Sequence, residues 1–250
     1  MDKEFALKLL NTALIKGADD AEVYVKESRS MSIEVKDLSV DTVESSASAG
    51  YSIRIIKNGR LGFSYSTNAD EYVFIAEKAI EAAGFSEFDQ YLKLPIPAKP
   101  AEVAVYDEKI PAITEKDAIR SALLIEEAAK SDSRISKIRK ASAGFNSSNT
   151  IIANSNGIEV FYKTTSCSAH IMAIAEEGAE SQMGWDFQAS RFLNDINFEE
   201  VGKTAAKRAS ALLGAKKINS IKGNVILDNS VTSEVLGILS SALSAESVQK

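Results

Sequence analysis

The feature that most constrains the fold of this chain is an Asn58-Gly59 dipeptide between two runs of β-forming residues. Asn-Gly tolerates the positive φ angles of a two-residue hairpin turn, so residues 50–67 are predicted to form a β-hairpin. Residues 20–27 and 30–38 alternate apolar with polar side chains, the pattern of strands with one buried face. The N-terminal part of the chain is therefore expected to contain a sheet with a tight hairpin in it.

Helical segments flank these strands. Residues 5–15 and 71–83 place apolar side chains three and four positions apart, and a glycine follows each segment, which favours a helix C-terminus. Residues 42–49 carry mostly small and polar side chains. We expect a strand exit or a mobile loop in that segment.

All four prolines lie in one stretch, residues 93–111. Proline lacks a backbone donor and resists helix formation, so this stretch is predicted to be a connector or an edge-strand crossing. It is also the best candidate for a boundary between two units. The four residues are Pro95, Pro97, Pro100 and Pro111.

After the prolines the order of elements repeats. The sequence predicts the α+β class, with two similar helix–strands–helix units that contain antiparallel or mixed sheets. The repeated order points to a duplication, although the residues themselves differ. The second unit is predicted to contain a helix at 115–131, strands at 135–147 and 150–154, a turn and return strand at 154–162, a hairpin of 166–175 with 182–190, and a closing helix at 198–213.

Residues 223–245 are predicted to be a strand that runs into an amphipathic helix. The apolar Val-Ile-Leu run at 225–227 indicates a buried strand. Ser230 is a suitable N-cap, and Glu234 would then lie in the first turn, where a carboxylate suits the helix dipole. The expected domains are a first unit at 1–92, a connector at 93–114, a second unit at 115–222 and the start of a C-terminal domain at 223–250.

Charge and cysteine content narrow the function classes. A net charge of −6 and a pI of about 5.1 give no attraction to phosphate backbones, so direct nucleic-acid binding is not expected. The single cysteine, Cys167, cannot form an internal disulfide, which fits a reducing compartment. The chain starts with a charged amphipathic helix instead of a signal peptide, and no apolar run approaches the ~18 residues of a membrane span. We expect a soluble, cytoplasmic protein without membrane contact.

The single histidine, His170, limits the metal chemistry that the chain can carry. Two histidines on one helix face, as in many zinc sites, are excluded. Cys167 and His170 have the spacing of half a metal site. However, both lie in a predicted strand, where side chains three positions apart point to opposite faces. A structural role is therefore favoured over a shared metal.

Two acidic clusters and three aromatic residues are further candidates. Glu176, Glu177 and Glu180 crowd a hairpin turn and could hold a divalent cation, but a solvated tip is the favoured interpretation. The same interpretation is given to Asp107 and Glu108. Trp185, Phe187 and Phe192 are expected either to lie in the core or to line a groove, and the core is favoured.

Several segments together resemble the PmbA/TldD family, whose members are described as modulators of DNA gyrase and are associated with metal-dependent peptidase activity. The segments are AEVYV at 21–25, GYSIRIIKNGRLGFS at 50–64, NSNGIEV at 154–160 and CSAHIMAIAEEGAESQMGWDF at 167–187. The resemblance covers most of the chain. None of these segments is catalytic in itself.

The C-terminal helix indicates which branch of the family the chain resembles. Members of the catalytic branch carry His-Glu-x-x-Gly-His there, with the histidines as zinc ligands and the glutamate handling the proton. Here Ser233 and Ile238 stand at the histidine positions, while Glu234 and Gly237 match the motif. Isoleucine has no donor atom and serine is not a usual zinc ligand. This pattern is similar to the PmbA (TldE-type) branch, and for Glu234 a solvated helical carboxylate is favoured over a catalytic role.

The resemblance implies a function as the non-catalytic, substrate-binding half of a two-subunit metalloprotease that cleaves small unfolded peptides. Zinc is then expected on a TldD-like partner and not in this chain, and the partner could also be a second copy, giving a dimer. Two alternatives remain open: an active metallopeptidase with ligands outside this chain, and a protein-binding modulator of DNA gyrase or of a toxin–antitoxin pair. Family members are usually longer, so a fragment or a missing C-terminal region is expected.

Overall fold

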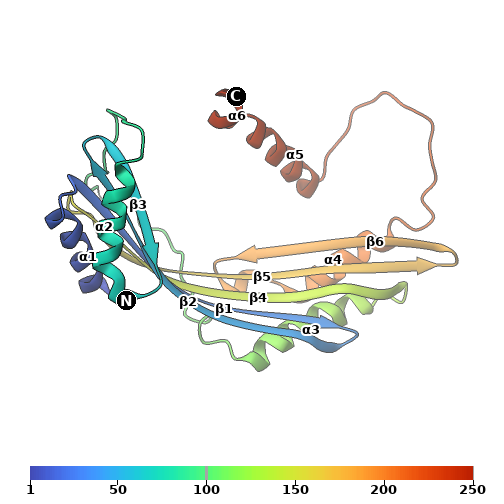
Figure 1. Ribbon diagram of the computed structural model, residues 1–250. Helices are drawn as coiled ribbons and strands as arrows, with labels where there is room; N and C mark the ends of the chain where they lie inside the picture. The colour runs from blue at the N-terminus through green and yellow to red at the C-terminus, as the bar shows by residue number, and fades with distance from the viewer. Residues whose placement is uncertain (99–100, 250) are drawn as a thin grey trace. The chain divides into compact units, whose positions relative to one another are not determined.

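One antiparallel sheet organises residues 1–214. The computed structural model describes residues 1–98 and 101–249, and within them six strands are hydrogen-bonded in the order β3-β2-β1-β4-β5-β6 (Figure 1). Every neighbouring pair is antiparallel, so of the two predicted sheet types only the antiparallel one occurs. The strands are β1 (Asp20–Lys36), β2 (Ser39–Lys57), β3 (Arg60–Ser66), β4 (Ile135–Asn154), β5 (Glu159–Glu177) and β6 (Glu180–Ser190).

Helices cover one face of this sheet at both of its ends. α1 and α2 pack on one end, and α3 and α4 pack on the other (Figure 1). The α+β class and the repeated order of helix, three strands and helix are therefore confirmed, and the two predicted units share a single sheet through the β1–β4 pair. The helices are α1 (Lys3–Ile15), α2 (Tyr72–Ala83) after the short 3-10 turn η1 (Ala69–Glu71), α3 (Glu115–Lys130), and α4 (Phe198–Ser210) after η2 (Leu193–Asp195).

The two-residue turn predicted at Asn58-Gly59 is present. β2 and β3 are joined at Asn58 and Gly59, whose φ angles are +50° and +67°. Two successive positive φ angles define the type I′ turn that matches the twist of a hairpin. The hairpin prediction for residues 50–67 is confirmed.

The strands are longer than the alternating segments predicted. β1 and β4 each run without a break, and residues 42–49 lie inside β2, so the loop expected there is wrong. The small polar side chains of this region pair across the strands: the Ser28 and Ser48 hydroxyls are 2.8 Å apart, and those of Ser30 and Ser46 are 2.7 Å apart. Backbone pairing and these cross-strand hydroxyl contacts stabilise a strand that hydrophobic periodicity does not detect.

The same five-residue pattern recurs on the two outer strands. β3 carries Leu61-Gly62-Phe63-x-Tyr65, and β6 carries Met183-Gly184-Trp185-x-Phe187. Each glycine lies directly beneath a closing helix: a Cβ on Gly62 would overlap the carbonyl of Ala79 in α2, and one on Gly184 would overlap backbone atoms of Ala205 and Ala209 in α4. The duplication is thus visible in residues as well as in the order of elements.

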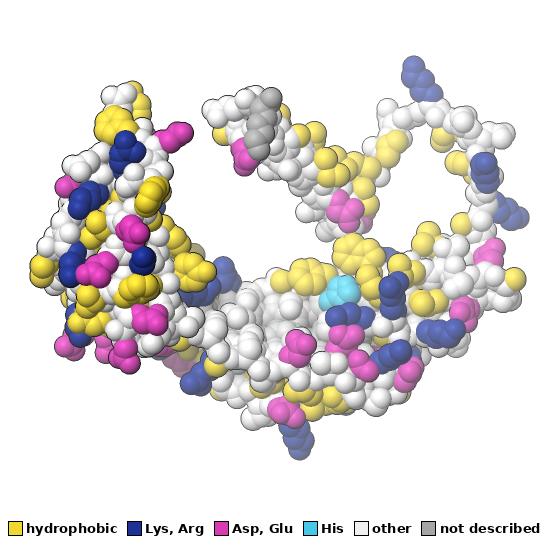
Figure 2. Space-filling view, viewed as in Figure 1, with side chains coloured by type: hydrophobic (Ala, Val, Ile, Leu, Met, Phe, Trp, Pro, Cys, Tyr) yellow, Lys and Arg dark blue, Asp and Glu magenta, His cyan; other side chains and the backbone are white. Residues whose placement is uncertain are grey.

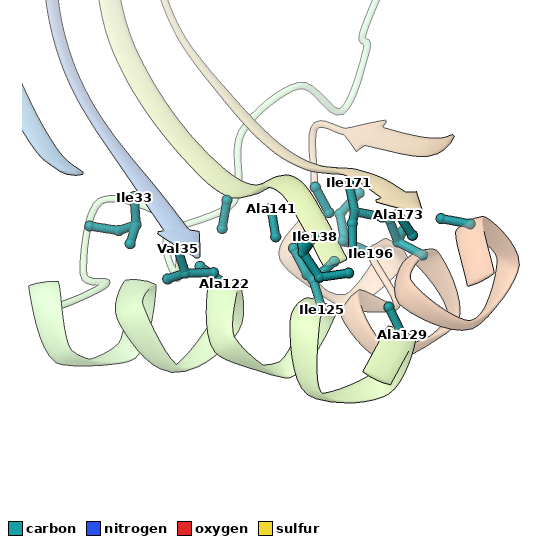
Figure 3. Packing of buried hydrophobic residues seen from close by; sticks show 14 of the residues in the cluster. Ile33, Val35, Ala122, Ile125, Ala129, Ile138, Ala141, Ile171, Ala173 and Ile196 are labelled. Atoms are coloured by element: carbon teal, nitrogen blue, oxygen red, sulfur yellow. The ribbon is translucent and has the colours of Figure 1, made fainter. Parts of the chain in front are cut away.

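Two separate hydrophobic cores lie between the sheet and its helices. One core packs α1 and α2 on the Ala21–Val25 side of β1, and it includes Ile53 and Ile55 of β2. The other packs α3 and α4 on Ile33 and Val35, together with alanines and isoleucines of β4 and β5 (Figure 3). Between Val25 and Ile33 the helix-side residues of β1 are Glu27, Arg29 and Met31; Met31 packs against the edge of the second core, and Arg29 is exposed.

The turn between α3 and β4 is tied to α4 by a carboxylate. Asp132 accepts hydrogen bonds from Nε of Arg134 at 3.0 Å and Nη2 at 2.8 Å, and from the Ser210 hydroxyl at 3.0 Å. The guanidinium of Arg134 is the main reason that the pKa of Asp132 lies well below its usual range, and the Ser210 hydroxyl adds to the effect.

Asp132→Asn is therefore expected to lower the free energy of unfolding by about 1–2 kcal/mol at pH 7. Because the folded pKa is depressed, this contribution is present at neutral pH and declines once the pH falls below about 4, where the unfolded carboxyl takes up a proton. Urea titrations of wild type and variant at pH 7, 5 and 3 would measure it. A difference that stays constant or grows toward pH 3 would contradict the assignment.

In the segment that was predicted to be a connector, no helix forms within the described residues 93–98 and 101–114. The Asn154 amide donates to the Pro95 carbonyl at 2.9 Å, and the Thr165 N–H donates to the Val105 carbonyl at 3.0 Å. The described parts of this segment are irregular and hydrogen-bonded to the sheet; Pro100 lies outside the described residues.

Residues 215–250 form a second unit, described here by itself. It contains α5 (Asn229–Ala242) and α6 (Ala245–Gln249), so the predicted helix is confirmed. The strand predicted at 225–227 is wrong: these residues are irregular, and the Ile226 side chain is 98% exposed. A β-branched run forms a strand only where another strand pairs with it, and none of the described strands does. The N-cap is Asp228, whose carboxylate accepts from the Ser230 N–H, and not Ser230.

Candidate functional site

The positions that correspond to the His-Glu-x-x-Gly-His motif lie on helix α5. Ser233, Glu234 and Ile238 are all exposed on it. Because α5 begins at Asn229, Glu234 lies in the second turn and not in the first, and the first turn contains no acidic residue. Neither Ser233 nor Ile238 offers an atom that zinc prefers. Among the described residues no group of three or more His, Cys, Asp or Glu side chains is close enough to hold a metal ion.

Cys167 and His170 point to opposite faces of β5, as predicted. Cys167 is 1% exposed and faces α3 and α4 within the second core. Burial raises the pKa of its thiol to about 11, and the nearby charges of Asp107 and Asp195 add to the effect. His170 is half-buried on the other face, and burial followed by the Lys140 ammonium lowers its pKa. The thiol is thus kept protonated and away from the imidazole, so the two groups cannot share a metal.

The two acidic clusters differ in their surroundings. Glu176, Glu177 and Glu180 are exposed at the end of the β5–β6 hairpin, in agreement with a solvated tip, and Glu180 accepts from the Gly214 N–H at 2.6 Å. Asp107 is not a solvated tip. Its carboxylate accepts from the backbone N–H groups of Leu193 at 2.9 Å and Lys109 at 3.0 Å, and these bonds lower its pKa.

The aromatic side chains of β6 lie on the open face of the sheet, opposite the helices. Trp185 is 41% exposed and Phe187 is 51% exposed, so the core position favoured for them is wrong. Gly184 faces α4, and strand alternation therefore turns its neighbours outward. In the strand register Phe187 is opposite His170, and Trp185 is opposite Met172. Figure 2 shows the histidine, in cyan, among these hydrophobic side chains.

The equivalent residues of β3 form a second aromatic group on the same face. Phe63 is 55% exposed and Tyr65 is 71% exposed. The central strands between the two groups present small hydroxyl side chains on that face. Figure 2 shows this uncharged band in white. The band consists of Ser28, Ser30 and Ser32 of β1, Ser46 and Ser48 of β2, Ser148 of β4, and Thr164, Ser166 and Ser168 of β5.

A pocket lies on the helix side of the sheet, where the two cores leave the central strands uncovered. It has a volume of about 660 Å³, and we call it the central pocket. A smaller cavity of about 360 Å³ continues from it along the same strands and shares Arg29 and Asn149 with it. The floor of the central pocket contains Arg29, Ser147, Asn149 and Lys163, and its wall contains Met31, Tyr106, Ile110, Pro111, Ile113 and Phe145.

No local sequence pattern predicts the central pocket. Arg29 and Lys163 belong to strands that are neighbours of β4 on either side, and Tyr106 belongs to the connector. Their proximity depends on the strand order, which no local pattern contains. The repeated order of elements could have suggested one shared sheet, in which β1 and β4, the first strand of each half, are neighbours.

Comparison with known proteins identifies the family. Residues 21–83 match the PmbA/TldA metallopeptidase domain 1, and residues 108–213 match the PmbA/TldA metallopeptidase central domain. The chain belongs to the PmbA/TldD family. The resemblance noted in the sequence is thereby confirmed.

The relatives of this PmbA/TldD protein extend beyond the part that it spans. The chain is 26% identical over 240 residues to a metalloprotease PmbA homolog of Buchnera aphidicola subsp. Acyrthosiphon pisum. The matched region covers 91% of this chain and 52% of that protein. This chain thus spans about half the length of the curated relatives that it matches.

Solved structures share the fold. A protein of Bacteroides thetaiotaomicron described as a modulator of DNA gyrase has a TM-score of 0.86 at 25% identity, over 99% of this chain and 58% of that one. TldE from Thermococcus kodakarensis has a TM-score of 0.74 at 20% identity, over 82% of this chain and 47% of that one. In the described residues none of the helices is long and apolar enough to span a membrane.

Proposed function

We propose that this chain is a PmbA/TldE-like, non-catalytic subunit of a TldD/PmbA-type metalloprotease. The observation that carries the proposal is the composition of α5, where Ser233 and Ile238 occupy the positions at which the catalytic branch of the family has histidines. Family membership supports the protease context. The fold shared with a TldE structure is consistent with the assignment to that branch.

In this function the chain helps to bind unfolded peptides, while zinc is held by a TldD-like partner. Within the described sheet no further strand pairs with the outer sides of the edge strands β3 and β6, although Arg60 of β3 forms a bridge with Phe88 and the Trp185 carbonyl of β6 accepts from Arg208. An extended peptide can add to such an edge through backbone hydrogen bonds, which gives affinity without selecting a sequence. The exposed aromatic groups on β3 and β6 lie next to these edges and supply apolar contacts for peptide side chains.

The proposal predicts a specific complex with a TldD-like subunit. The tagged chain, co-expressed with the TldD-like protein of its own host, is expected to elute with it as one complex of defined mass in size-exclusion chromatography with light scattering. A TldD-like protein from an unrelated host, at the same expression level, is the control for non-specific association. A chain that forms only copies of itself, with no cognate complex, would contradict the partner assignment.

A modulator of DNA gyrase is the second candidate, because one of the structural relatives carries that description. The net charge of −6 restricts such a role to protein contacts, since the chain has no attraction to DNA. Binding to purified gyrase in the absence of any TldD-like subunit would favour it.

A further inference from the structure

The central pocket is a polar interruption between two apolar cores. On the helix side of β1 the apolar side chains stop at Val25 and resume at Met31, with Glu27 and Arg29 in between. On β4 the same positions are held by Ser147 and Asn149, which face Arg29 and Glu27 in the strand register. A continuous core could have run through this point, and charged and amide side chains stand there instead.

Two cations in the pocket have no anionic partner. No carboxylate of the described residues forms an ion pair with Arg29 or Lys163, whereas the one carboxylate nearby, Glu27, is bound to the N-terminal ammonium of Met1 at 2.6 Å. Lys163 instead lies 5.5 Å from the ring centre of Tyr106. The pocket therefore has an excess of positive charge in a protein that is acidic as a whole.

The two cations are placed to act on one ligand. Arg29 pairs with Ser147 in the β1–β4 register, and Lys163 pairs with Asn149 in the β4–β5 register. Their Cα atoms are thus two strands and two residues apart, roughly 12 Å from standard strand spacings, and both long side chains can reach an anion between them. Hydrogen bonds to a carboxylate from such donors are the strong, charge-assisted kind.

The connector supplies a further side of the central pocket, and hydrogen bonds to β5 hold it in place. The Thr165 N–H donates to the Val105 carbonyl at 3.0 Å, and the Asp107 N–H donates to the Thr165 hydroxyl at 2.8 Å. Tyr106 lies between these two anchor points and is fixed over Lys163. The wall beyond it is apolar, and its accessible part consists of Met31, Pro111 and Ile113. A ligand in this pocket meets cations on one side and an apolar surface on the other.

We propose that the central pocket binds the C-terminal end of a peptide whose last residue is apolar. The carboxylate lies between Arg29 and Lys163, and the last side chain lies against Met31, Pro111 and Ile113. The preceding residues extend into the adjoining smaller cavity past Asn149. A volume of about 660 Å³ suits a short peptide end. This inference rests on the proposed function, because it names the part of the peptide that the chain holds.

Isothermal titration of the chain with an N-acetylated Gly-Gly-Ala-Leu peptide tests it. The free acid is expected to bind at least roughly tenfold more tightly than its C-terminal amide. Arg29→Gln and Lys163→Gln are each expected to weaken the free acid roughly tenfold and to leave the amide unchanged. Lys26→Gln, on the same strand as Arg29 but on the opposite face, is the matched control and should bind as wild type does.

Inorganic phosphate distinguishes a peptide site from a general anion site. Phosphate should compete only weakly, because it cannot use the apolar wall. Equal binding of acid and amide, no binding of either, or an effect of Lys26→Gln as large as that of Arg29→Gln would overturn the inference. Tight phosphate binding without peptide binding would overturn it in favour of a small anion. These results concern the isolated chain, so they are separate from the success or failure of complex formation with a TldD-like subunit.

Discussion

Replacing Gly62 or Gly184 by alanine is expected to destabilise residues 1–214 by about 3 kcal/mol each. A Cβ on Gly62 would overlap the carbonyl oxygen of Ala79, and a Cβ on Gly184 would overlap backbone atoms of Ala205 and Ala209. The colliding atoms belong to helix backbones, so a rotamer change cannot relieve the overlap. The whole of α2 or α4 has to move off the sheet.

Gly144→Ala is the matched control for these variants. Gly144 also lies within a strand, but a Cβ there would meet only the Ser168 hydroxyl, at 2.9 Å, and that side chain can rotate away. We expect a change of less than about 1 kcal/mol for it. Urea unfolding followed by the fluorescence of Trp185, the only tryptophan, measures all three variants. Equal losses for Gly144→Ala and Gly62→Ala would contradict the contact-based explanation.

Lys130→Ala is expected to cost about 3–5 kcal/mol because it leaves a buried charge without a partner. Glu126 is fully buried in α3, and its Oε1 lies 3.0 Å from Nζ of Lys130, one helical turn away. In the part of the chain that the structure describes, neither carboxylate oxygen of Glu126 has a hydrogen-bond donor aligned with it. Lys130 is therefore the main source of compensation for this charge, and it also lies 3.7 Å from Asp37.

A double variant separates the charge effect from a loss of packing. Glu126→Leu combined with Lys130→Met removes both charges and keeps most of the side-chain volume, and it is expected to recover most of the stability lost in Lys130→Ala. Free energies of unfolding of the single and double variants, measured at pH 7, decide the matter. A loss below about 1 kcal/mol in Lys130→Ala, or no recovery in the double variant, would show that Glu126 does not depend on this ion pair.

The local features of this fold could be predicted where short-range rules apply. Asn58-Gly59 identified a hairpin because its backbone angles are a local property, and helical periodicity located α1 to α5 within a few residues. The central part of β2 was missed because Ser45, Ser46 and Ser48 have no apolar periodicity, and the neighbouring strands determine their conformation. The Val-Ile-Leu run at 225–227 failed for the converse reason: the pattern suits a strand, but no described strand pairs with it.

The candidate sites also divide into features that a local sequence pattern predicts and features that depend on tertiary contacts. The expectation that Ser233 and Ile238 stand where the family motif has metal-binding histidines comes from the sequence alone. The central pocket depends on β1, β4 and β5 lying side by side, and its cations are more than 130 residues apart in the chain. The outward position of Trp185 follows from the contact of Gly184 with α4, which is a tertiary contact. Such relations appear only when the strand order is known.

The central claim is that this chain takes part in proteolysis without holding the catalytic zinc, and zinc content together with peptidase activity tests it most directly. The chain alone, its TldD-like partner alone, and their complex would be assayed by elemental analysis and by cleavage of an unfolded peptide. We predict no stoichiometric zinc and no cleavage for the chain alone, and both for the complex. Stoichiometric zinc on the isolated chain, with cleavage that a chelator abolishes, would contradict the claim and make the chain an enzyme in its own right.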